Sequence, residues 1–101
     1  MTKRLQILSE FKTPLPLMQA IGIKVLLPYE SGSVLEKNAV DIVDAERGMI
    51  DVTITEFEMQ GLKVGDGQNF RCEITMPDHK LVVLFSKGLN VKLEGERKVW
   101  R

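Results

Sequence analysis

The sequence contains one cysteine, Cys72, and one histidine, His79, among its 101 residues. A single cysteine cannot form a disulfide within the chain, and with no second histidine beside His79 a zinc site would need unusual ligands. A nucleophilic triad needs a histidine held against a carboxylate, but His79 and its neighbour Asp78 lie in a segment whose composition predicts an exposed turn. We therefore expect no metal, no cofactor and no catalytic residue, and we predict that the protein is not an enzyme.

Charge of one sign is not in excess either, because fourteen basic and fourteen acidic residues give a formal net charge of zero. Proteins that bind nucleic acid or anionic membranes usually carry a basic surplus, so we expect neither as a partner. The apolar run at residues 20–28 contains Lys24 and is far shorter than the roughly twenty residues of a membrane span. Polar residues interrupt the apolar stretch that follows Lys3 and Arg4, so we expect no signal peptide and synthesis in the cytoplasm.

Loops that bind ions or phosphates are not evident. The acidic residues between positions 41 and 51 do not have the spacing of a calcium-binding loop. Gly65-Asp66-Gly67 lacks the Gly-Lys-Ser/Thr sequence that follows in a phosphate-binding loop, and we interpret it as a turn between strands.

Hydrophobic residues make up 44% of the chain, which is enough for one core and, at this length, for a single domain over residues 1–101. Strict alternation of apolar and polar residues predicts two half-buried strands in the second half of the chain. The first has Ile50, Val52 and Ile54 facing inward. The second spans residues 68–76, with Phe70, Cys72, Ile74 and Met76 facing inward. Cys72 is then a small buried hydrophobe rather than a reactive thiolate.

A hairpin is predicted where residues 77–79 form a turn and residues 80–92 continue as a strand. We expect Gly88 to introduce a bulge or bend into this strand. The predicted inward residues are Leu81, Val83 and Phe85 before the glycine, and Leu89 and Val91 after it.

The first half of the chain predicts a central strand at residues 17–28, with Ile21, Ile23, Val25 and Leu27 facing inward, and an edge strand at residues 5–11. A short helical turn is expected at residues 56–60, because Thr55 and Glu58 match a capping box and Gly61 suits a left-handed C-cap. Residues 33–46 fit two interpretations: their apolar spacing allows a helix, whereas their β-branched residues favour strands.

These elements predict an all-β fold, an immunoglobulin-like antiparallel β-sandwich of six or seven strands with one short helical turn. The C-terminus offers a candidate interaction site, because tryptophan and arginine are enriched in interface hot spots. Its residues are Arg97, Val99, Trp100 and Arg101. The alternative is that Val99 and Trp100 form a last edge strand that caps the core.

From Val40 onward the turn and strand signals follow one another in a particular order. The positions that form this order are Asp44-Ala45, Gly48, residues 50–54, Leu62, Gly65, Phe70 and Glu73-Ile74. Over about the last sixty residues this order resembles small immunoglobulin-like modules of bacteriophage tails, and it is similar to the N-terminal domain of phage baseplate upper proteins. The first forty residues share only a general strand pattern with these modules. The resemblance implies an assembly role and a final location in a virion.

We therefore predict a non-enzymatic assembly module whose partner is a tail or baseplate protein, a second copy of the chain, or both. The alternative is a small ligand-binding β module for carbohydrate or single-stranded nucleic acid. Such modules use exposed aromatic side chains, and the chain has six aromatics, of which we expect Phe57, Phe70 and Phe85 to be in the core.

Overall fold

The computed structural model describes residues 2–9, 13–38 and 41–100, without the side chains of residues 86 and 87. These residues form eight strands and one helix. In chain order they are β1 (Thr2–Gln6), β2 (Gly22–Pro28), β3 (Val34–Lys37), β4 (Asp41–Asp44), β5 (Met49–Thr53), α1 (Glu56–Gly61), β6 (Gly65–Thr75), β7 (Leu81–Glu94) and β8 (Arg97–Trp100).

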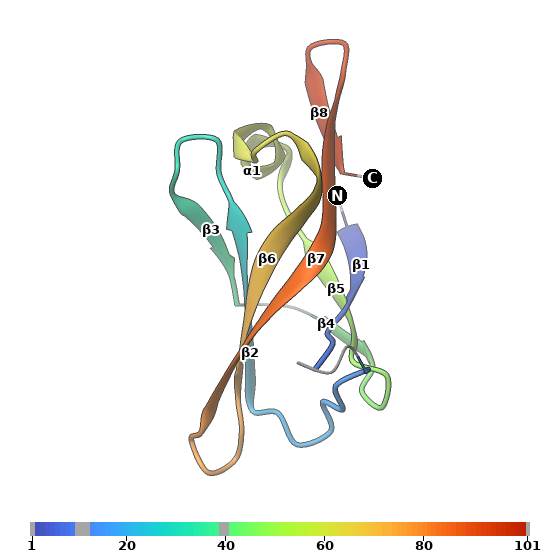
Figure 1. The fold of residues 1–101 in the computed structure, drawn as a ribbon, viewed down its shortest axis with the longest axis vertical. Helices are drawn as coiled ribbons and strands as arrows, with labels where there is room; N and C mark the ends of the chain where they lie inside the picture. The colour runs from blue at the N-terminus through green and yellow to red at the C-terminus, as the bar shows by residue number, and fades with distance from the viewer. Residues whose placement is uncertain (1, 10–12, 39–40, 101) are drawn as a thin grey trace.

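The strands form two antiparallel sheets, one with the order β1-β5-β4 and one with the order β3-β2-β6-β7-β8. The all-β fold with one short helix is therefore confirmed. Inward residues of both sheets, such as Ile50 of β5 and Cys72 of β6, belong to one buried cluster. The molecule is elongated, 45 × 22 × 22 Å, and the long β6–β7 hairpin runs along most of its length (Figure 1).

Residues 33–46 contain the strands β3 and β4, so the helical interpretation of this segment is wrong and the strand interpretation is confirmed. Their β-branched residues favour extended backbone, and β3 pairs with β2 while β4 pairs with β5. With β3 and β4 counted as two strands, the described residues contain eight strands, more than the six or seven that we predicted.

Alternation predicts the inward faces of β2, β5 and β6 correctly. Buried side chains are Ile23, Val25 and Leu27 in β2, Ile50 and Val52 in β5, and Phe70, Cys72 and Ile74 in β6. β2 lies inside its sheet, as predicted, but it begins at Gly22, and Ile21 is exposed because it precedes the strand. β1 is an edge strand that begins and ends earlier than predicted, and Phe11 lies outside the described residues.

The inward face of β7 differs from the prediction on one side of Gly88. Leu89 and Val91 are buried as expected, but Leu81, Val83 and Phe85 are exposed, while Val82 and Leu84 pack against the core. Gly88 has φ +111° and lies at a register shift between β6 and β7, so the predicted bulge is present. Residues 81–85 are all apolar, and a run without alternation does not indicate which face is inward.

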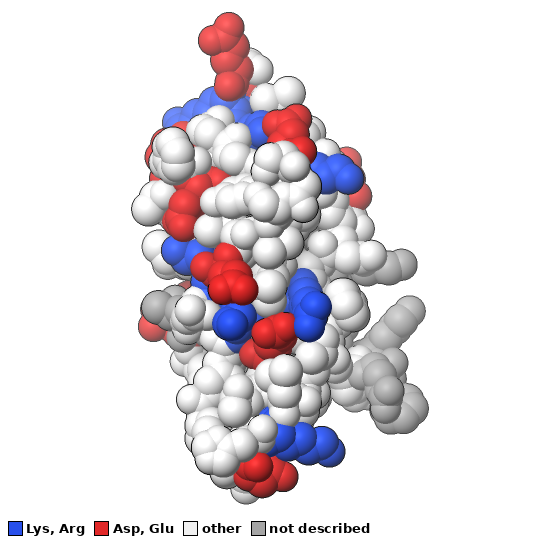
Figure 2. Space-filling model, turned by 90° about the vertical axis from the view of Figure 1, so that its left-hand side faces the viewer, with Lys and Arg blue, Asp and Glu red and all other residues white. Residues whose placement is uncertain are grey.

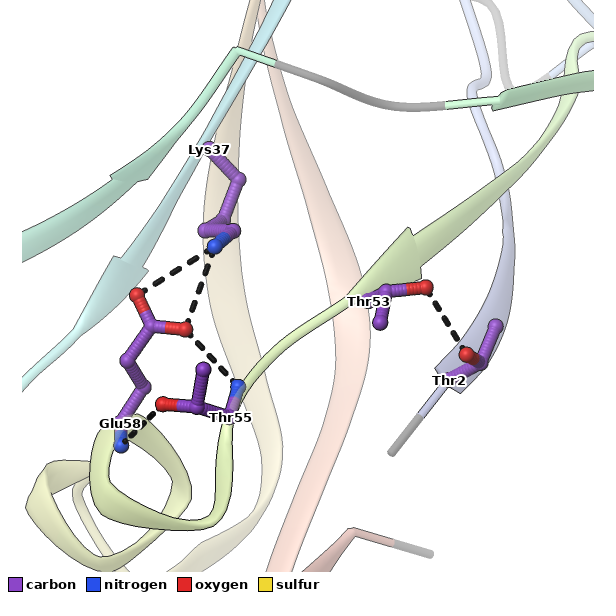
Figure 3. A network of polar contacts seen from close by, with 5 residues as sticks. All are labelled: Thr2, Lys37, Thr53, Thr55 and Glu58. Carbon is purple, nitrogen blue, oxygen red and sulfur yellow. Dashed lines mark hydrogen bonds and ion pairs between the residues drawn. The ribbon is translucent and has the colours of Figure 1, made fainter.

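The helix α1 begins with the predicted capping box (Figure 3). The Glu58 N–H donates to Thr55 Oγ1 at 3.1 Å, and the Thr55 N–H donates to Glu58 Oε1 at 2.8 Å. Lys37 of β3 also donates to both oxygens of the Glu58 carboxylate, at 3.1 and 3.3 Å. These bonds, with the Thr55 N–H bond as the largest cause, hold the pKa of Glu58 below its usual value of 4.5.

The end of α1 differs from the prediction, because Gly61 is the last helical residue and the C-cap is Leu62, with φ −69°. Gly61 does not have positive φ; a Cβ there would lie 2.9 Å from Cε1 of Tyr29, so close approach accounts for the glycine. Gly65-Asp66-Gly67 belongs to the start of β6 rather than to a turn between strands.

The turn between β4 and β5 depends on Gly48, which has φ +68°. A Cβ at this position would lie 2.6 Å from the carbonyl oxygen of Leu15 and 2.7 Å from that of Ile7. The Ile7 N–H donates to the Gly48 carbonyl at 2.8 Å, so this turn is packed against the chain that leaves β1. At the other end of the paired strands β1 and β5, the hydroxyls of Thr2 and Thr53 form a 2.8 Å hydrogen bond (Figure 3).

The helix α1 has six residues, and in the described part of the chain no helix is long and apolar enough to cross a bilayer.

Candidate interaction surfaces

The C-terminal strand β8 is an edge strand that pairs with the end of β7. Its Trp100 is 8% exposed and belongs to the core cluster, and Val99 is half-buried. Trp100 therefore has the core-capping position that we considered as the alternative to an interface. Arg101 lies outside the described residues.

Side chains of β8 also hold the strand against α1. Arg97 donates two hydrogen bonds to the carboxylate of Glu56, both at 2.9 Å, and these bonds lower the pKa of Glu56. The amide of Gln60 bonds the backbone of Lys98 in both directions, at 3.0 and 3.2 Å. The Lys98 ammonium reaches Glu30 at 2.6 Å. An interface role for Arg97 and Val99 stays a prediction, with Arg97 already paired within the fold.

Two of the three phenylalanines that we expected in the core are on the surface. Phe70 is 4% exposed, whereas Phe57 is 89% and Phe85 is 71% exposed. Phe57 lies in α1, which is too short to bury more than one side chain, and that side chain is Met59. Phe85 lies on the face of β7 that points away from the core.

Phe57 lines a surface depression of about 490 Å³ between α1 and the β2–β3 loop. The other lining residues are Tyr29, Glu30, Ser31, Gln60 and Gly61. Its walls are mostly apolar, and Glu30 is already paired with Lys98. The depression could hold a small apolar group, but no set of converging polar side chains marks it as a catalytic site.

Phe85 belongs to a second apolar area, on the outer face of the five-stranded sheet. It lines a depression of about 360 Å³ together with Leu26, Pro28 and Val34, and the guanidinium of Arg71 lies 5.9 Å from its ring centroid. Charged pairs flank this area: Arg71 with Glu73 at 2.7 Å, and Lys24 with Glu36 at 4.0 Å.

On the face that Figure 2 shows, lysine and arginine lie beside aspartate and glutamate, with uncharged surface between them. This mixture agrees with the net charge of zero.

One long stretch of sheet edge is open on the β7 side. β6 pairs with β7 from Leu81 to Val91, but β8 pairs with β7 only from Val91 to Glu94. Within the described residues, no strand covers the other side of residues 81–90, which we call the open β7 edge. In Figure 1 this part of β7 runs down the molecule, away from β8.

Among the described residues, the side chains that we considered for catalysis or metal binding are buried, exposed in a turn or already paired. Burial raises the pKa of the Cys72 thiol to about 12, which keeps it protonated at neutral pH. His79 is exposed in its turn, with φ +62°. Asp51 is paired with Arg4 at 3.0 Å, and Asp44 is paired with Arg47 at 3.7 Å. Within residues 2–9, 13–38 and 41–100, no three aspartate, glutamate, histidine or cysteine side chains are placed to hold a metal ion.

Comparisons with protein-family models, with curated proteins and with solved structures found no match to this chain. The resemblance to phage tail modules therefore stays a prediction from the sequence.

Proposed function

We propose that the protein is a non-enzymatic assembly module that acts through protein–protein contacts. The observation that carries this proposal is the open β7 edge, whose residues 81–86 contain no charged side chain. An uncovered edge strand presents unpaired N–H and C=O groups that another strand can extend. Leu81, Val83 and Phe85 add exposed apolar side chains to the same strand.

The assembly that we propose is a phage or prophage tail or baseplate. The support for this choice is the sequence pattern from Val40 onward. A small module with balanced charge and several sheet edges suits a role in which it docks on a larger component or repeats around it.

The test is to measure the mass of the purified chain in solution and its binding to purified tail and baseplate proteins encoded in the same genome. An assembly module should self-associate or bind at least one of these proteins. A chain that stays monomeric up to about 500 µM and binds none of them would contradict the proposal.

The second candidate, a small ligand-binding module, gains support from the exposure of Phe57, which lines the depression between α1 and the β2–β3 loop together with Tyr29. Exposed aromatic side chains are the usual platforms for sugars and for unstacked bases. A glycan array and a single-stranded DNA shift assay test it, with Phe57→Ala as the matched variant. Submillimolar binding that Phe57→Ala removes would favour this candidate over assembly, and its absence would eliminate it.

A further inference from the structure

Residues 81–86 of the open β7 edge differ from the other sheet edges because they carry no charge; the first charged residue along this edge is Lys87. Natural proteins protect edge strands by making them short and by placing charged side chains on them. The edge strands β1, β3, β4 and β8 have four or five residues each. Each carries at least two charges: Lys3 and Arg4, Glu36 and Lys37, Asp41 and Asp44, Arg97 and Lys98. Residues 81–86 of β7 carry none.

The backbone groups on this edge can be assigned from the ladder. The Met76 N–H donates to the Lys80 carbonyl at 2.9 Å, so the Lys80 carbonyl points toward β6, while the Lys80 N–H donates to Asp78 Oδ1 at 3.0 Å. Because backbone groups alternate along an antiparallel strand, Val82 and Leu84 also direct theirs toward β6. The N–H and C=O groups of Leu81, Val83 and Phe85 therefore point out of the open edge.

We infer that this edge pairs with the same edge of a second copy of the chain, antiparallel, with the two-fold axis at Val83. This inference rests on the proposed assembly function and names its partner. In this register Val83 faces Val83 of the second copy, and Leu81 faces Phe85. The outward-pointing backbone groups of all three residues then form one continuous ladder between the copies. Two five-stranded sheets become a single ten-stranded sheet.

The side chains fit this register, because residues 81, 83 and 85 point to one face and are all apolar. Apolar cross-strand pairs, particularly of an aromatic with an aliphatic side chain, stabilise adjacent strands. The bulge at Gly88 limits the regular stretch at one end, and the turn at residues 77–79 limits it at the other. Val83 lies at the centre of what remains.

Charge favours a second copy as the occupant. Glu73 and Arg71 of β6 lie opposite Val83 and Phe85. In the pair of copies the two Glu73 residues are three strand spacings apart, about 14 Å. This distance exceeds the Debye length of about 8 Å at physiological ionic strength, so the two Glu73 carboxylates do not oppose the contact. The net charge of zero removes repulsion between whole copies. A two-fold contact also uses up both open edges, so association stops at two.

The experiment is sedimentation of the purified full chain from about 5 to 500 µM, the range suited to a small interface. The wild-type chain should form dimers as its concentration rises. Val83→Lys places two ammonium groups opposite each other and should weaken dimerisation at least tenfold. The matched control is Val34→Lys, at an exposed valine on the opposite edge of the same sheet face, which should dimerise as the wild type does.

Cross-linking tests the register. Hydrogen-bonded antiparallel partners have Cα atoms about 5.5 Å apart, within disulfide range. Val83→Cys should therefore form a disulfide-linked dimer on mild oxidation, with buried Cys72 unreactive. Leu81→Cys alone should not, because the two introduced cysteines lie four residues out of register, about 13 Å apart. Linkage in Leu81→Cys but not in Val83→Cys would overturn the register.

The outcomes separate this inference from the proposed function. A monomeric wild-type chain that binds a tail protein, and loses that binding in Val83→Lys, overturns self-pairing but keeps the assembly role. Dimerisation that Val83→Lys leaves intact overturns the edge assignment, as does growth beyond two copies. The contact contains no ion pair, so raising the salt concentration from 0.05 to about 0.5 M should change the dissociation constant less than about threefold.

Discussion

Replacing Phe70 with alanine is expected to lower the free energy of unfolding by about 3 to 5 kcal/mol. Phe70 is 4% exposed, lies in β6 and belongs to the buried cluster that both sheets share. Removing its ring leaves a cavity in the core on the inner face of the five-stranded sheet, and the hydrogen-bonded backbones of the sheet cannot shift far enough to fill it. A domain of this size has a total stability of about 5 to 15 kcal/mol, so the loss is a large fraction of it.

Phe85→Ala is the matched control, because it removes the same ring from the neighbouring strand on the opposite face of the sheet. Phe85 is 71% exposed, and the guanidinium of Arg71 lies in contact with its ring, 5.9 Å from the ring centroid. Loss of that contact should cost about 0.5 to 1 kcal/mol. Urea titration followed by the fluorescence of Trp100, the one tryptophan, measures both variants. A loss below about 1 kcal/mol for Phe70→Ala, or equal losses for the two variants, would refute the assignment of faces.

Three further predictions concern the turn, the helix cap and the C-terminus. Gly48→Ala should lower the free energy of unfolding by at least about 2 kcal/mol, because overlap of the new Cβ with backbone atoms adds to the strain of positive φ. Gly67→Ala also has positive φ but open space around it, and should lower the free energy of unfolding by about 1 kcal/mol. Equal melting temperatures for the two variants would contradict this. The folded state lowers the pKa of Glu58, so its stabilisation is present above about pH 5 and is lost as pH falls through the folded pKa. Glu58→Gln should therefore reduce the acid sensitivity of the melting temperature, and an unchanged profile would exclude this role. Removing residues 97–101 should lower the melting temperature by at least about 10 °C, because the buried Trp100 is lost, and it should leave dimerisation intact. An unchanged melting temperature together with lost association would instead establish the C-terminus as the interface.

Local rules predicted the parts of the fold in which one signal dominates. In residues 50–54 and 69–76 polar and apolar residues alternate strictly, so one face must be buried, and Ile50 and Cys72 lie on it. In α1 the pair Thr55 and Glu58 satisfies two backbone groups at the helix start, which is a local requirement that the sequence displays directly.

Tertiary contacts decided the parts that local rules missed. Phe57 is exposed because α1 has too few turns to bury two faces, and helix length is not evident from the capping box. Gly61 is required by the approach of Tyr29, a residue thirty-two positions earlier, rather than by a left-handed cap. The contacts of Trp100 with the core and of Arg97 with Glu56 also join distant parts of the chain. No local pattern specifies such contacts.

The misassigned segment of β7 has a physical meaning of its own. When one face of a sheet is exposed to solvent, polar and apolar residues alternate along its strands, because water favours polar side chains on the exposed face. Residues 81–85 do not alternate, and in the single chain one of their faces packs on the core while Leu81, Val83 and Phe85 stay exposed. The composition of the segment is that of a strand with apolar neighbours on both faces. Pairing at the open β7 edge gives Leu81, Val83 and Phe85 apolar neighbours from the second copy. Self-association therefore explains why residues 81–85 do not alternate, which is the feature that prevented us from assigning their inward face from the sequence. If Val83→Lys and Val34→Lys are equally monomeric or equally dimeric, this explanation fails and the apolar run has no account in the fold.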